Sequence, residues 1–82
     1  MTIKYELNKD IVARVATQLN FSLNTIKDSI FIIKNERCFN GKSLIGILAN
    51  NLKKGEIIEI KASDKDILNI REIFNKVGKE VK

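Results

Sequence analysis

The stretch Asp10-Ile11-Val12-Ala13-Arg14-Val15-Ala16-Thr17 turns a short polar loop into an amphipathic helix and carries an arginine on the first helical turn. A helix start offers unpaired backbone N–H groups and the positive end of the helix dipole, and the Arg14 guanidinium adds further donors beside them. The stretch is therefore a candidate anion-binding site. It holds no reactive group, because Val12 stands at the helix start and the chain has no histidine.

Hydrophobic periodicity on both sides of this stretch predicts an α+β fold. Alternating residues predict a half-buried strand over 2–7, and apolar residues at helical spacing predict a helix over 11–23. Three further strands are predicted over 29–34, 37–40 and 56–62. A helix of about two turns is predicted to begin after a Ser43 cap. The last predicted element is a helix of about four turns that begins after a Ser63 cap and runs over 67–81.

The predicted element order is β-α-β-β-α-β-α. Each predicted helix has a single apolar stripe, and the strands share one strongly apolar face. Helices of this kind bury their stripes by packing on one face of an antiparallel sheet. The sequence therefore predicts an open-faced α/β sandwich, with an antiparallel four-stranded sheet and three helices on one face.

Length and composition predict a single domain over 1–82. The chain is 82 residues long, with 44% hydrophobic and 30% charged residues, which is typical of a small folded protein. Its apolar runs are too short to cross a membrane, and its start lacks the charged segment followed by an apolar segment that is typical of a signal peptide. The lone Cys38 cannot form an internal disulfide and, next to Phe39, is expected to be packed. We therefore expect a cytoplasmic protein.

The net charge of +5 favours acidic partners or anions. It also admits RNA, but most aromatic residues fall where strand or helix periodicity would bury them, which argues against a stacking platform. No metal-ligand spacing, phosphate-binding glycine loop or protected carboxylate pair is present, so neither metal nor cofactor is expected. The aromatic residues are Tyr5, Phe21, Phe31, Phe39 and Phe74.

Two stretches resemble the same family. The run 11–17 is similar to the Ile-His-Ala-Arg-Pro-Ala active-site run of HPr, the histidine-containing phosphocarrier protein of the bacterial sugar phosphotransferase system. The run Lys42-Ser43-Leu44-Ile45-Gly46-Ile47-Leu48 resembles the regulatory-serine run Lys-Ser-Ile-Met-Gly-Val-Met of HPr from low-GC Gram-positive bacteria. The resemblance spans essentially the whole chain and implies the HPr fold.

The resemblance places Val12 where the family has its phosphoacceptor histidine. In the family, that histidine takes phosphate from enzyme I and passes it to a sugar permease component. The isopropyl side chain of Val12 has no lone pair, so it can neither carry a phosphoryl group nor relay a proton. Arg14 matches the family arginine that contacts the phosphohistidine. It is either an anion-binding residue or a solvated arginine.

Ser43 matches the serine that an ATP-dependent HPr kinase phosphorylates in the family. The phosphorylated protein then acts as a corepressor with a catabolite-control transcription factor. A phosphate at a helix N-terminus meets free N–H groups and a favourable dipole, so this modification suits the predicted position. The alternative role for Ser43 is a simple helix cap, which contributes about 1 kcal/mol to stability.

An exposed apolar patch is expected beside Ser43, matching the surface on which the family docks its partners. Contiguous exposed apolar residues usually mark an interface, although in so small a domain these side chains could instead cover part of the core. Basic residues around such a patch would suit an acidic partner. The apolar residues are Ile11, Val12, Leu44, Ile45 and Leu48, and the basic ones are Arg14, Arg37 and Lys42.

The sequence thus predicts an HPr-like protein that is not an enzyme but a regulatory or protein-binding module, switched at Ser43. It is similar to the catabolite-repression paralogues of HPr, in which the histidine is also absent and the serine is retained. The expected partners are proteins, including an HPr kinase and a catabolite-control transcription factor. Two alternatives stay open: a phosphocarrier that uses Thr17 or Ser43 as acceptor, and a diverged module that binds an unrelated protein or RNA.

Overall fold

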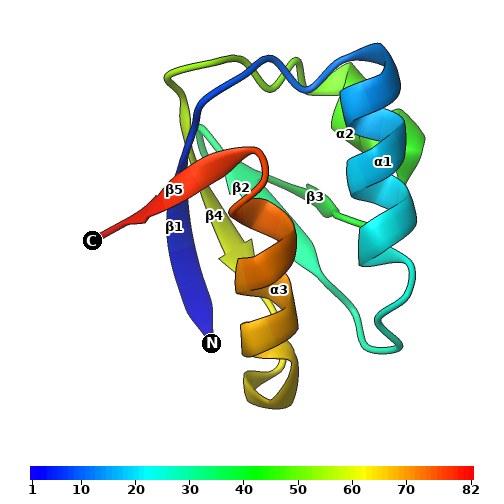
Figure 1. The fold of residues 1–82 in the computed structure, drawn as a ribbon, viewed down its shortest axis with the longest axis vertical. Helices are drawn as coiled ribbons and strands as arrows, with labels where there is room; N and C mark the ends of the chain where they lie inside the picture. The colour runs from blue at the N-terminus through cyan, green and yellow to red at the C-terminus, as the bar shows by residue number, and fades with distance from the viewer.

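The computed structural model describes residues 1–82, which form a five-stranded antiparallel sheet with helices on one face (Figure 1). The strand order is β3-β2-β4-β1-β5. The strands are β1 (Thr2–Leu7), β2 (Phe31–Lys34), β3 (Arg37–Asn40), β4 (Ile57–Lys61) and β5 (Gly78–Val81). The helices are α1 (Ala13–Leu23), α2 (Leu44–Ala49) and α3 (Ile67–Phe74), and a short 3-10 turn (Asp64–Asp66) precedes α3. The predicted open-faced sandwich is confirmed.

The side-chain alternation in the strands separates a buried face from an open one. Tyr5 of β1 lies opposite Ile58 of β4, and both side chains are fully buried. One position away, Lys4 lies opposite Glu59 on the other face of the sheet. The buried face and the helices together enclose a core of 19 hydrophobic residues, and no polar or charged residue is buried. Burial of apolar surface between these two layers is therefore the main stabilising force.

The C-terminal segment corrects two predictions, the four-stranded sheet and the four-turn last helix. α3 ends at Phe74, and Gly78–Val81 pairs with the edge of β1 as a fifth strand. A Cβ atom on residue 78 would lie 2.4 Å from the Glu6 carbonyl oxygen, so only glycine permits this approach. Val77 is buried in the turn between the two elements. The apolar spacing that suggested a helix is satisfied by a turn and a strand.

Polar contacts join α3 and the residue after it to β1 and β5. The Tyr5 hydroxyl donates to Asn75 Oδ1 at 2.6 Å and to the Arg71 carbonyl oxygen at 3.2 Å. Arg71 Nε lies 3.0 Å from Glu80 Oε1, which joins α3 to β5. Burial, followed by the negative charge of Glu80, raises the pKa of the Tyr5 hydroxyl, so it stays a neutral donor.

Two further local predictions, the Ser63 cap and a packed Cys38, are wrong. The Ser63 side chain forms no capping hydrogen bond, because the 3-10 turn replaces the expected first turn of α3. Cys38 is exposed, since β3 is an edge strand and this side chain points away from the helices. Phe21 and Phe31 are 75% and 40% exposed, but Phe21 lies on α1 and Phe31 on the open face of the sheet. They therefore do not form one stacking platform.

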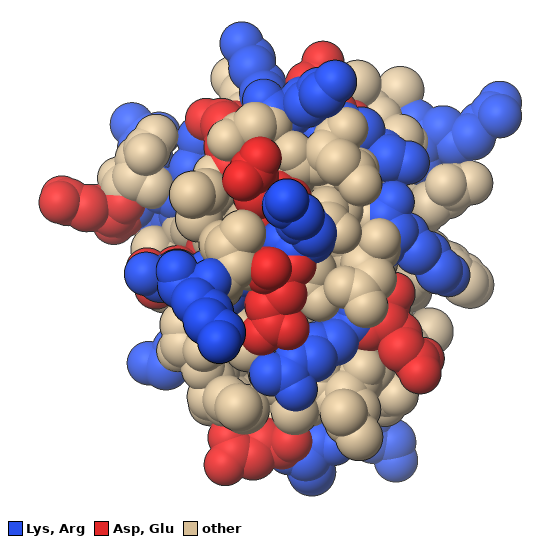
Figure 2. Space-filling model, turned by 60° about the vertical axis from the view of Figure 1, so that its left-hand side comes forward, with Lys and Arg blue, Asp and Glu red and all other residues tan.

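The surface charge is mixed on the side of the molecule where β1 and β5 lie. Figure 2 turns this side toward the viewer and shows basic and acidic side chains interspersed with uncharged ones. This face has no continuous basic field of the kind that binds a nucleic-acid backbone. No helix has the length and hydropathy that a membrane span requires.

Candidate functional site

The start of α1 is an open helix N-terminus. Val12 is the N-cap residue, with extended backbone angles (φ −131°, ψ 161°) and no side-chain group that caps the helix. Its carbonyl oxygen accepts hydrogen bonds from the amides of Val15 at 3.0 Å and Ala16 at 3.4 Å. The amides of Ala13 and Arg14 have no acceptor within the protein. Two backbone donors therefore remain available to a ligand or to solvent.

Neighbouring backbone contacts fix the conformation of this helix start. The amide of Ile11 donates to the Leu52 carbonyl oxygen at 2.8 Å, and Asp10 Oδ1 accepts a hydrogen bond from the Lys54 amide at 2.9 Å. Ala13 has a φ of 47°, a region that non-glycine residues enter only at a cost of about 1 kcal/mol. The surrounding contacts impose this strained entry into α1.

The side chains at the start of α1 include no imidazole. Val12 is 53% exposed and aliphatic, and Arg14 is exposed and forms neither an ion pair nor a side-chain hydrogen bond. The hydroxyl of Thr17 donates to the Ala13 carbonyl oxygen at 3.1 Å. The unbonded amides and the unpaired Arg14 are groups of the kind that bind anions in proteins.

Ser43 caps α2 as the sequence predicts. Its Oγ accepts a hydrogen bond from the Gly46 amide at 3.1 Å, and its carbonyl oxygen accepts one from the Ile47 amide at 3.0 Å. Ile47 is fully buried, so this end of α2 is anchored in the core. Asn24, which follows α1, donates from Nδ2 to the Lys42 carbonyl oxygen at 3.1 Å. The end of α1 and the start of α2 are thereby tied together.

The helices α1 and α2 are neighbours (Figure 1), and exposed apolar side chains lie on α2 and at the start of α1. Ile45 is 79% exposed and Leu48 is 43% exposed, whereas Leu44 is half-buried and packs on the core. Ile11 departs from the prediction: it is 1% exposed, because it precedes the helix and points into the core. We call the remaining set, Val12, Leu44, Ile45 and Leu48, the α1–α2 face.

The basic residues expected around this face are free of acidic partners. Arg14 and Arg37 are exposed, Lys42 is half-buried, and none of them forms an ion pair. Lys34, by contrast, is held by Glu56 at 3.1 Å and by the carbonyl oxygens of two residues after α2. The unpaired side chains are therefore available to a negatively charged partner.

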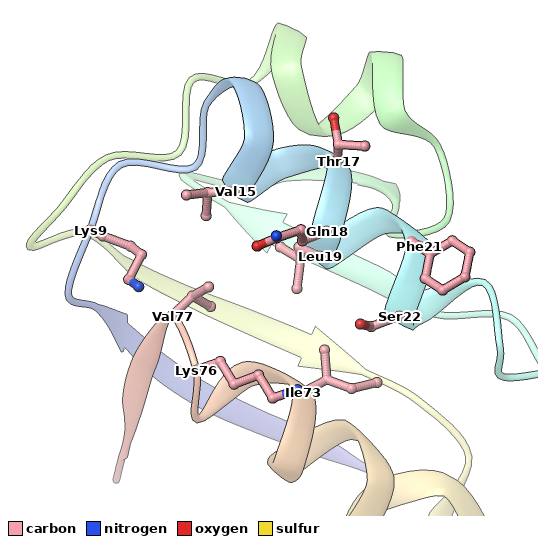
Figure 3. Close-up of a pocket in the computed structure, with 10 residues that line it drawn as sticks. All are labelled: Lys9, Val15, Thr17, Gln18, Leu19, Phe21, Ser22, Ile73, Lys76 and Val77. Carbon is pink, nitrogen blue, oxygen red and sulfur yellow. The ribbon is translucent and has the colours of Figure 1, made fainter.

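A groove between α1 and α3 was not foreseen from the sequence (Figure 3). It lies on the side of α1 that faces α3. The signal in the sequence was Phe21, an aromatic residue off the apolar stripe of the predicted helix 11–23. Its exposure became evident only when the two helices were placed beside each other.

Comparisons with known proteins agree on one family. The family model described as "PTS HPr component phosphorylation site" matches residues 1–76. The histidine-containing phosphocarrier protein of a mycoplasma is 26% identical, with a TM-score of 0.80, and the match covers 93% of each chain. The phosphocarrier protein HPr of Bacillus anthracis is 25% identical, with a TM-score of 0.75, and covers 94% of this chain and 93% of its own.

A third structure, HPr from Thermoanaerobacter tengcongensis, is similar in fold. It has a TM-score of 0.77 at 20% identity, and the match covers 94% of this chain and 88% of that one. No curated protein sequence matches the chain.

Proposed function

Because the chain belongs to the HPr family of the bacterial phosphotransferase system, we propose that it is a member that binds and regulates proteins without carrying phosphate on residue 12. In this proposal it is not an enzyme. Its partners are proteins that recognise the α1–α2 face, and its phosphorylation state at Ser43 selects among them.

The observation that carries the proposal is Val12 at the start of α1. The amides of Ala13 and Arg14 at the helix start have no acceptor in the protein, and the side chain at residue 12 is an isopropyl group. Phosphoryl transfer through this position needs an imidazole or another nucleophile, and the chain has no histidine. Val12 instead adds exposed apolar area to a docking surface.

Ser43 is the proposed switch. Its hydroxyl lies at the N-terminus of α2, and the Gly46 amide already donates to it. After phosphorylation, the phosphate oxygens would take over this hydrogen bond and gain from the dipole of α2, so the fold would tolerate the added charge. The modification would also place about two negative charges beside Ile45, which changes which partners can dock.

The first test is intact-mass spectrometry after incubation with ATP and an HPr kinase. We expect one phosphoryl group on the parent protein and none on Ser43→Ala. Ser63→Ala is the matched control, because Ser63 also precedes a helical segment but forms no capping bond, and it should be modified like the parent. An unmodified parent, or a label that survives in Ser43→Ala, would overturn the regulatory proposal.

The docking surface has its own test. Ile45→Glu changes a side chain that is 79% exposed, so it should leave the free energy of unfolding within about 0.5 kcal/mol of the parent. If the kinase docks on the α1–α2 face, Ile45→Glu should lower the rate of Ser43 phosphorylation at least about tenfold, because the substitution buries a charge at the centre of the contact. An unchanged rate would show that the kinase binds elsewhere.

A further inference from the structure

The groove between α1 and α3 is apolar at its base and lies outside the α1–α2 face. It has a volume of about 550 Å³. Leu19 and Val77 are buried and form its floor, while the half-buried Val15 and Ile73 form its walls. Figure 3 shows Leu19 of α1 pointing toward Ile73 of α3 and toward Val77, which follows α3, and these two side chains point back toward α1. Both helices thus present apolar side chains to the same open space.

The groove continues along both helices. Phe21, Ser22 and Ile73 also line a second hollow of about 310 Å³, so the two hollows adjoin. Thr25 and Asn69 are shared by this hollow and a third one of about 320 Å³. The whole groove follows the length of α3, which at 1.5 Å per residue is about 12 Å. This length corresponds to about two turns of a docked helix.

A helix suits this groove better than an extended peptide. Extended peptides bind by adding a strand to a free sheet edge, where unpaired backbone groups are available. The walls here are two helices, whose backbone groups are largely bonded internally. A helix satisfies its own backbone and contributes only its side chains, as in other helix-in-groove complexes. Phe21, which is 75% exposed at the rim, would cover the docked side chains.

The charge of the lining side chains differs between the first and the second hollow of the groove. Lys9 and Lys76 line the first hollow, and neither forms an ion pair. The second hollow has Glu72 in place of a basic residue. Two unpaired ammonium groups in the first hollow favour a partner with carboxylates there, and Glu72 disfavours carboxylates at the second hollow. The third hollow has side chains of both signs, Lys27, Asp28, Lys65 and Asp66, and adds no preference for either charge.

We propose that this groove binds an amphipathic helix of a partner protein, with carboxylates on the helical turn that meets Lys9 and Lys76. The apolar side of the helix packs on Leu19, Ile73 and Val77. This site is separate from the α1–α2 face and does not depend on Ser43. The protein could therefore hold one partner in the groove while its family docking surface engages another.

The test is an NMR titration of the full-length ¹⁵N-labelled protein with two synthetic helical peptides of about sixteen residues. Both carry leucines on one face and an i, i+4 cross-link on the other, so that each is helical before binding. The first has two glutamates in its first turn, and the second has two lysines there. We expect shifts of the amides that line the groove and about tenfold tighter binding of the acidic peptide.

Variants distinguish specific binding in the groove from non-specific binding of the peptides to exposed apolar side chains. Phe21→Ala should weaken binding of the acidic peptide at least about fivefold. Leu68→Ala should leave that affinity unchanged, because Leu68 is 71% exposed on α3 but does not line the groove. The double variant Lys9→Glu/Lys76→Glu should prefer the basic peptide. The proposal is overturned if the acidic peptide causes no saturable shifts up to about 1 mM. Shifts confined to Ile45 and Leu48, or a preference that the double variant leaves unchanged, would also overturn it.

Discussion

Replacement of Ser43 by alanine should destabilise the protein by about 1 kcal/mol. The substitution removes the 3.1 Å hydrogen bond from the Gly46 amide to Ser43 Oγ and leaves that amide without a protein acceptor. The backbone bond from the Ile47 amide to the Ser43 carbonyl oxygen remains, so α2 should weaken rather than unfold. α2 has only six residues, so its stability depends strongly on this cap. For a domain of this size, 1 kcal/mol corresponds to a fall in Tm of about 4–8 °C.

Urea denaturation followed by far-ultraviolet circular dichroism measures this change. Ser43→Asp keeps a capping acceptor and should recover most of the lost free energy. Ser63→Ala, at a helix start without a side-chain cap, should stay within about 0.5 kcal/mol of the parent. If Ser43→Ala unfolds at the same urea concentration as the parent, the cap contributes nothing and our reading of α2 is incorrect.

Three further substitutions test other parts of the structure. Glu36 has a φ of 68° in the β2–β3 turn, so Glu36→Gly should relieve backbone strain and raise the urea midpoint by the equivalent of about 1 kcal/mol. Gly78→Ala would place a Cβ 2.4 Å from the Glu6 carbonyl oxygen and should cost about 2 kcal/mol, with the β5 amides losing hydrogen-exchange protection first. Burial raises the pKa of Glu56, but hydrogen bonds from the Lys53 amide and Lys34 outweigh it, so the pKa lies below 4.5. The stabilisation from Glu56 is thus present above about pH 4.5 and lost as the pH falls through the folded-state pKa, so Glu56→Gln should be less stable than the parent near pH 7 and closer to it near pH 3.

The layered fold could be predicted because most elements have a single periodicity. Alternation over 2–7 gave β1 with its observed bounds, and the Ser43 cap correctly located the start of α2. The last segment was ambiguous, since Val77 and Val81 are four residues apart and fit a helix. What decides against the helix is the free edge of β1, together with a glycine small enough to approach it. That edge exists only in the assembled sheet.

The candidate site was predictable where it depended on local sequence and not where it depended on packing. The open helix start and the exposed Ile45 and Leu48 follow from helical spacing. Ile11 was misplaced because the helix was expected to begin there, whereas α1 begins at Ala13 and Ile11 turns into the core. The α1–α3 groove depends on how two helices that are distant in sequence lie against each other, and the off-stripe Phe21 alone does not indicate which helix lies beside it.

Phosphoryl transfer from phosphoenolpyruvate through enzyme I tests the central claim most directly. Intact-mass spectrometry should show the parent protein unmodified, because Val12 supplies no acceptor and the Thr17 hydroxyl is hydrogen-bonded to the Ala13 carbonyl oxygen. An authentic histidine-bearing HPr in the same tube confirms that the enzyme I is active. A phosphoryl group on the parent chain under these conditions, and still present in Ser43→Ala, would show that the protein carries phosphate by another route and would contradict the account.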